Sequence, residues 1–169
     1  MKHLTKPIRA IHFMVLAFLM ALSSPVVAQD FRKGLEAYVA EDYVSAFNIW
    51  MPLAKAGKAK AQRSIGVLYE DGKGVSKDSE AAMAWYLLAA SQDDSDASFM
   101  MGTMYHFGSG IPINYVLGHM WYNISRANGA KWVQEYIDTI SEKMSLEAIE
   151  KAQQMATICM RSKYKKCGY

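Results

Sequence analysis

Two cysteines near the C-terminus are the residues of this sequence whose chemistry is easiest to predict. Cys159 and Cys167 are its only cysteines, and an even number in an exported chain favours a disulfide. On one continuous helix their Cα atoms would lie about 12 Å apart, whereas a disulfide needs about 4.4–6.8 Å. We therefore expect the last helix to end between them and the tail to fold back into a structural disulfide. A metal-binding or redox pair is the alternative, although the chain has no C-x-x-C motif.

The histidines and one serine are weaker candidates for chemistry. His106 and His119 have no nearby cysteine or suitably spaced carboxylate, so we expect surface or half-buried side chains, no metal site and no cofactor. Ser162 and Lys165 fit the S-x-x-K pattern of penicillin-reactive enzymes, but the accompanying S-D-N and K-T-G elements are missing. The sequence thus predicts no catalytic residue and no enzymatic activity.

The first 28 residues have the features of a cleaved signal peptide. Three cationic residues precede an apolar run from Ala10 to Leu22, and small residues follow up to Ala28. Because a membrane span needs about 20 apolar residues, we expect cleavage after Ala28, a periplasmic or secreted protein and no remaining membrane span. The whole chain has 19 basic and 16 acidic residues. Since the leader holds three of the basic ones, the mature chain is neutral and lacks the basic excess typical of nucleic-acid-binding proteins.

The segments that position these side chains repeat along the chain. Seven residues recur at a fixed offset of 36 positions, and a period of 20–50 residues predicts a solenoid of stacked units. Each unit reads as two helices joined by a glycine-rich turn, and no segment has a convincing strand pattern, so we predict an all-α fold. The aromatic pairs of the repeat should pack between helices. The residues that recur 36 positions later are Ala61, Gly66, Tyr69, Gly72, Gly74, Trp85 and Tyr86, which reappear as Ala97, Gly102, Tyr105, Gly108, Gly110, Trp121 and Tyr122.

We predict four antiparallel helix pairs after the leader, within one domain of residues 29–169. Two repeats span about 59–94 and 95–130, a degenerate unit spans 30–58, and a C-terminal capping pair spans 131–169. Side chains that accept a backbone hydrogen bond should start several helices. These expected N-caps are Asp42, Asp78 or Ser79, Ser95 or Asp96, Asn114 and Ser145.

The repeat pattern resembles that of a known family. A-x-x-x-I-G-x-x-Y-x-x-G-x-G-V-x-x-D, followed by A-x-x-W-Y-x-x-A-A, is similar to the Sel1-like repeat, a relative of the tetratricopeptide repeat. Residues 61–90 match nearly every position, residues 97–127 depart at five, and residues 31–57 match only in their second helix. The resemblance implies a right-handed superhelix with a concave face. It also implies an adaptor function, as in bacterial periplasmic and cell-envelope members, without shared catalytic residues.

The first helix of each repeat should present its outward positions to a partner, because first helices line the concave side in this family. Phe99 is the most suggestive of them, since exposed aromatic residues often anchor partners; alternatively it packs against a neighbouring loop. The expected protein-binding positions are Arg63, Val67, Glu70, Phe99, Thr103 and His106.

The sequence therefore predicts a monomeric periplasmic or secreted adaptor that binds another envelope protein without catalysis. Two alternatives stay open. One is an enzyme acting on a β-lactam or cell-wall substrate, and the other is a structural component of a secretion or polysaccharide-export machine.

Overall fold

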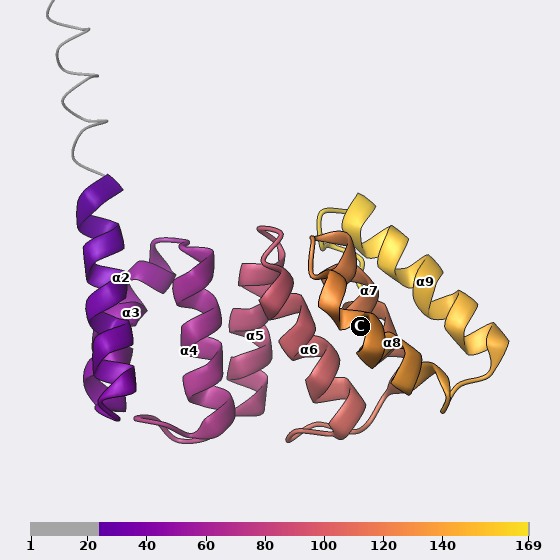
Figure 1. The fold of residues 1–169 in the computed structure, drawn as a ribbon, viewed down its shortest axis with the longest axis horizontal. Helices are drawn as coiled ribbons and strands as arrows, with labels where there is room; N and C mark the ends of the chain where they lie inside the picture. The colour runs from indigo at the N-terminus through magenta and orange to yellow at the C-terminus, as the bar shows by residue number, and fades with distance from the viewer. Residues whose placement is uncertain (1–23, 169) are drawn as a thin grey trace, which may run out of the picture.

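In a computed structural model, residues 24–168 of the chain are described, and they form eight α-helices, one short 3-10 helix and no strand (Figure 1). The predicted all-α solenoid is confirmed. The predicted signal peptide falls largely outside the described residues. The helices are α2 (Ser24–Val39), α3 (Tyr43–Lys55), α4 (Ala59–Asp71), α5 (Ser79–Ala90), α6 (Ser95–Phe107), α7 (Tyr115–Ala127), η1 (Lys131–Val133), α8 (Gln134–Ser141) and α9 (Leu146–Arg161).

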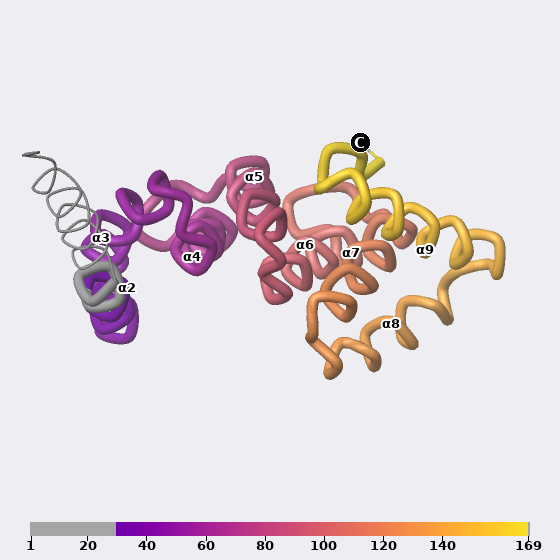
Figure 2. The backbone as a smooth tube through the Cα atoms, turned by 90° about the horizontal axis from the view of Figure 1, so that it is seen from above, coloured from indigo at the N-terminus to yellow at the C-terminus, as the bar shows by residue number. Residues whose placement is uncertain are grey.

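The helices alternate between two sides of the solenoid. Each helix packs against the next one along the chain from α2 to α7, and α7 also contacts η1, α8 and α9. Seen from above, α2 and α8 extend further to one side than α4 and α6, which lie between them (Figure 2). This side, lined by the first helix of each pair, is therefore concave.

Most helix starts follow the predicted capping residues. Asp42, Asp78, Asn114 and Ser145 each accept a backbone hydrogen bond from the third residue that follows, at 2.9–3.2 Å. One prediction is wrong: α6 is capped by Asp94, which accepts from the Ala97 amide at 2.8 Å, and not by either of the next two residues.

Some predicted helix bounds also needed correction. The spacing of Phe31, Leu35, Tyr38 and Val39 predicts a first helix over residues 30–41, but α2 begins at Ser24 and ends at Val39. The apolar spacing also predicts one helix from Lys131 to about Lys143. Instead this segment begins with the tight turn η1 and its α-helical part ends at Ser141.

The repeated glycines and tyrosines form a matched contact in each Sel1-like unit. A Cβ atom on Gly66 would lie only 2.5 Å from Cε1 of Tyr86, and a Cβ on Gly102 would clash in the same way with Tyr122. Both tyrosines are completely buried. A residue without a side chain is thus required where these helices approach each other. Trp121 is completely buried as predicted, while Trp85 is partly buried.

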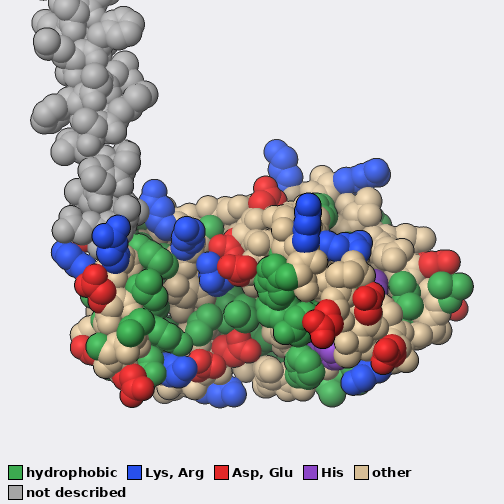
Figure 3. Space-filling model, in the orientation of Figure 1, with side chains coloured by type: hydrophobic (Ala, Val, Ile, Leu, Met, Phe, Trp, Pro, Cys, Tyr) green, Lys and Arg blue, Asp and Glu red, His purple; other side chains and the backbone are tan. Residues whose placement is uncertain are grey.

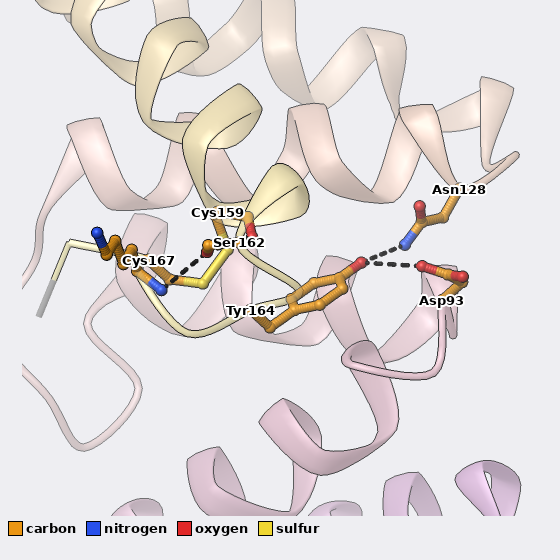
Figure 4. Close-up of a disulfide and its surroundings, with 7 residues drawn as sticks. Asp93, Asn128, Cys159, Ser162, Tyr164 and Cys167 are labelled. Carbon is orange, nitrogen blue, oxygen red and sulfur yellow. Dashed lines mark hydrogen bonds between the residues drawn. A yellow bond between two sulfur atoms is a disulfide. The ribbon is translucent and has the colours of Figure 1, made fainter.

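The C-terminal tail folds back against the preceding units, and the predicted disulfide is present (Figure 4). The chain reverses direction at Lys163 and Tyr164, which both have positive φ angles. The Cα atoms of Cys159 and Cys167 are 4.4 Å apart.

Tyr164 fastens this tail to the rest of the molecule. Its hydroxyl group accepts a hydrogen bond from Asn128 Nδ2 at 2.9 Å and donates one to Asp93 Oδ1 at 3.3 Å (Figure 4). Its ring stacks on Trp121, with centroids 6.3 Å apart. The tail therefore ties the last helix to the loops that end α5 and α7.

Candidate interaction surface

The side of the molecule that carries α4, α6 and α8 faces the viewer in Figure 3. Hydrophobic side chains gather across the middle of this face, and acidic side chains lie over the region of α8. The residues expected to bind a partner belong to α4 and α6. The structure gives each of them a specific set of contacts.

Arg63 links two successive repeats. Its Nε atom lies 3.1 Å from Asp94 Oδ1, and its Nη2 atom lies 3.2 Å from Asp96 Oδ2. The side chain keeps about a quarter of its surface exposed, 26%. Asp94 therefore both caps α6 and holds Arg63, a role that the sequence analysis missed because it placed the cap one or two residues later.

Glu70 is held by a buried tyrosine. The Tyr86 hydroxyl group donates to Glu70 Oε2 at 2.7 Å. Burial raises the pKa of Glu70, although the hydrogen bond from Tyr86 opposes that effect. Burial and the neighbouring Glu70 carboxylate also raise the pKa of Tyr86 far above its usual range.

Val67 and Thr103 leave few groups available to contact a partner. Val67 is partly buried against the core. The Thr103 hydroxyl group donates to the Met100 carbonyl oxygen at 2.8 Å within the same helix.

Phe99 belongs to an aromatic cluster that joins α6 to the C-terminal pair. Its ring stacks on Tyr122 at 5.6 Å between centroids and meets Trp132 and Tyr136 edge to face at 4.7 and 4.8 Å. Trp132 falls among the regularly spaced apolar residues of the segment 131–143, which predicts a buried side chain, but it is 54% exposed. The cluster thus has a buried part, formed around Tyr122, and an outer aromatic edge.

His106 and His119 are more deeply buried than expected, with 3% and 1% of their surfaces exposed. His106 is covered by α7, which approaches α6 closely at Gly118: a Cβ atom on Gly118 would lie 3.3 Å from the His106 backbone nitrogen. Burial lowers the pKa of both imidazoles, and nearby cationic side chains lower it further. Both rings are therefore neutral near pH 7.

The two ring nitrogens of His106 have different surroundings. Its Nδ1 atom lies 3.2 Å from the Tyr122 hydroxyl oxygen. Within the described part of the chain, its Nε2 atom is buried without a hydrogen-bond partner. Buried polar atoms are rarely left unpaired, and Nε1 of the buried Trp121 is a second such atom among the described residues.

A cleft of about 210 Å³ lies beside His106, between the end of α6 and α8. Phe107 forms part of its wall and is 60% exposed. Sequence reasoning singled out only His106 here, because Glu135, Tyr136 and Thr139 belong to the C-terminal pair, outside the two repeats. The lining residues are His106, Phe107, Glu135, Tyr136 and Thr139.

Other candidate chemistry is accounted for by local structure. The Ser162 hydroxyl group donates to the Cys159 carbonyl oxygen at 2.8 Å and accepts from the Lys166 amide at 2.9 Å, so it serves the terminal turn. Residues 24–168 contain no cluster of three or more side chains suited to hold a metal ion. No helix in the same range is long and apolar enough to cross a membrane.

Comparison with known sequences identifies the repeat. The Sel1 repeat family model matches residues 59–94 and 95–129. The ERAD-associated E3 ubiquitin-protein ligase component HRD3A of Arabidopsis thaliana is 30% identical over 90 residues, which cover 53% of this chain and 13% of HRD3A. The chitin synthase regulator SKT5 of Saccharomyces cerevisiae is 39% identical over 64 residues, which cover 38% of this chain and 9% of SKT5. The match therefore spans a small part of either relative.

Solved structures share the fold. A protective antigen of uropathogenic Escherichia coli with an SLR fold superposes with a TM-score of 0.74 at 22% identity, over 82% of this chain and 31% of that one. A Sel1 repeat protein from Oxalobacter formigenes superposes with a TM-score of 0.65 at 26% identity, over 86% of this chain and 63% of the other.

Proposed function

Because this chain carries two Sel1 repeats in an all-α solenoid, we propose that it is an adaptor that holds another protein against its concave side. The proposal rests on one observation above all. The residues that build the scaffold are the same at equivalent positions of α4 and α6, whereas the residues nearer the surface differ. Arg63 of α4, for example, corresponds to Phe99 of α6. Surface variation on a constant scaffold is how repeat proteins acquire binding specificity.

The relatives support a role in protein assembly. HRD3A is described as a component of a ubiquitin ligase, and SKT5 as a regulator of chitin synthase. Each is named for its action together with an enzyme. We infer a corresponding role here, in which the chain binds a partner and makes or breaks no covalent bond.

We further propose that the protein acts outside the cytoplasm. The N-terminal sequence has the pattern of a signal peptide. Disulfides persist in oxidising compartments, and Cys159 and Cys167 are joined. The partner is then another protein of the cell envelope.

Site-specific photo-crosslinking in cells tests the adaptor role. A photoreactive amino acid is placed at Thr103, on the concave side, or at Leu88 of α5, which is exposed on the other side. We expect a discrete crosslinked species from Thr103, identified by mass spectrometry, and none from Leu88. Equal crosslinking from both positions, or no species from either, would overturn the proposal.

A further inference from the structure

We propose that the cleft between α6 and α8 is a specificity pocket that receives one arginine side chain of the partner. This inference rests on the proposed adaptor function and names the chemistry that the partner must present. It is carried by the size of the cleft, its aromatic walls, its charge and the Glu135 carboxylate that lines it.

The size of the cleft indicates a single side chain. Its volume of about 210 Å³ is below the roughly 300–1,000 Å³ of pockets that enclose drug-sized molecules. The exposed ring of Phe107 forms part of its lining. A long side chain projecting from a protein segment fits this shape, whereas a free metabolite would be left largely in solvent.

The walls of the cleft offer flat aromatic surfaces. The ring of Phe107 stacks on His106 with centroids 4.2 Å apart, and Tyr136 of α8 lines the opposite side of the cleft. A planar guanidinium group stacks on such rings more readily than an ammonium group does. The walls therefore favour arginine over lysine.

The charge of the cleft favours a cation. Glu135 lines it, and exposed Asp138 and Glu142 lie on the same segment. Within residues 30–168, none of these three carboxylates forms an ion pair with a lysine or arginine. One cation, Lys143, lies close enough to His106 to lower its pKa, and its Nζ atom is over the ring of Tyr115, 5.5 Å from the centroid. The three carboxylates outnumber it, so the surroundings of the cleft are acidic overall. The acidic side chains over α8 are visible in Figure 3.

The Glu135 carboxylate supplies the last feature. A guanidinium group has five N–H donors in a fixed plane. Two of them can meet one carboxylate side by side, a bidentate geometry that a lysine ammonium group lacks. The exposed Glu135 side chain that lines the cleft can therefore hold a guanidinium group that stacks on the aromatic walls.

Titration of isotope-labelled protein with short peptides tests the pocket by NMR. The protein is recovered from the envelope of cells expressing the full chain. The probes are acetylated Gly-Gly-X-Gly-Gly peptides in which X is arginine, lysine or citrulline, the last being the uncharged counterpart of arginine. We expect saturable shifts of the His106, Phe107 and Tyr136 amides with the arginine peptide, and at least tenfold weaker binding of the other two.

Two matched variants locate the binding. Glu135→Gln should weaken binding of the arginine peptide at least fivefold, whereas Glu80→Gln, an exposed glutamate on α5, should leave it unchanged. Unsaturable shifts, equal binding of citrulline or lysine, or an equal effect of both variants would overturn the proposal.

The crosslinking and peptide-binding experiments distinguish failure of the pocket from failure of the adaptor role. If Thr103 still crosslinks equally well to the partner in Glu135→Gln, the adaptor role stands and the arginine pocket is rejected. If the arginine peptide binds at the cleft but no concave position crosslinks, the pocket stands and the adaptor role is rejected.

Discussion

The hydroxyl group of Tyr122 lies 3.2 Å from Nδ1 of His106, and this pair occupies the positions that Tyr86 and Glu70 hold 36 residues earlier. The tyrosine is constant because the facing glycine leaves room only for its ring. Its partner changes from a carboxylate to an imidazole. One scaffold contact thus supports two different side-chain chemistries, a carboxylate and an imidazole, in successive repeats.

Removing the two hydroxyl groups should have unequal effects on stability. Tyr86→Phe leaves the half-buried Glu70 without its 2.7 Å donor, so we expect the free energy of unfolding to fall by about 1–2 kcal/mol. Tyr122→Phe removes a longer bond to a neutral ring and should cost about 1 kcal/mol or less. Urea denaturation at pH 7 measures both, with Tyr69→Phe as the control. A Tyr86→Phe value no larger than that of the control would contradict this interpretation.

Acidification should destabilise the protein through its histidines. Burial lowers the pKa of His106 below its ordinary value of 6.5, so the folded state disfavours protonation. The stability that this provides is complete above pH 6.5 and is lost as the pH falls toward the lowered pKa.

The variant His106→Gln should therefore lose less stability than the wild type between pH 7 and pH 5.5. Glu70 has a raised pKa and acts in the opposite direction, but it is present in both proteins and cancels in the difference. Chemical denaturation across this pH range measures the slopes, and parallel slopes would rule out the proposed role of His106.

Substituting the helical glycine of either repeat should destabilise the fold. Alanine normally favours a helix over glycine by up to about 1 kcal/mol, but a Cβ on Gly66 would meet the Tyr86 ring at 2.5 Å. We expect Gly66→Ala to lower the free energy of unfolding by about 1–3 kcal/mol. In a Tyr86→Leu background the same change should cost much less, because the ring is gone. Thermal melts of the four proteins test this, and an unchanged cost in the second background would refute the clash.

Reducing the disulfide should weaken the C-terminal attachment. The bond closes a short loop, with a sequence separation of 8, for which chain entropy predicts about 2–3 kcal/mol of stabilisation. Reduced protein should unfold at a lower urea concentration than oxidised protein. Tyr164→Phe keeps the disulfide and removes only the hydrogen bonds to Asn128 and Asp93, so it should lower the midpoint less. Two free thiols in denatured, unreduced protein would disprove the bond.

The fold was largely predictable because local sequence signals are sufficient to define the repeat. The fixed spacing of glycine and tyrosine, together with capping residues such as Asp78 and Asn114, defines helix pairs without reference to distant contacts. The cap of α6 was misplaced because three acidic residues, at 93, 94 and 96, compete at that position. The local sequence gives no basis for choosing among them.

The surface was less predictable because it depends on contacts between units. The burial of His106 follows from the close approach of α7 at Gly118. The position of Phe99 depends on Trp132 and Tyr136, more than 30 residues away. Neither relationship follows from helical periodicity, and both lie at the junction with the divergent C-terminal pair.

The position of α7 at the centre of the C-terminal half has a consequence for motion. This helix contacts α6, η1, α8 and α9, while α2, the first of the described helices, packs mainly against α3. Elements held on several sides open rarely, whereas end units of a repeat array fray. Amide hydrogens should therefore exchange with solvent fastest in α2 and slowest in α7. The half of the molecule that carries the proposed arginine pocket is then the half that stays formed while the other end opens and closes.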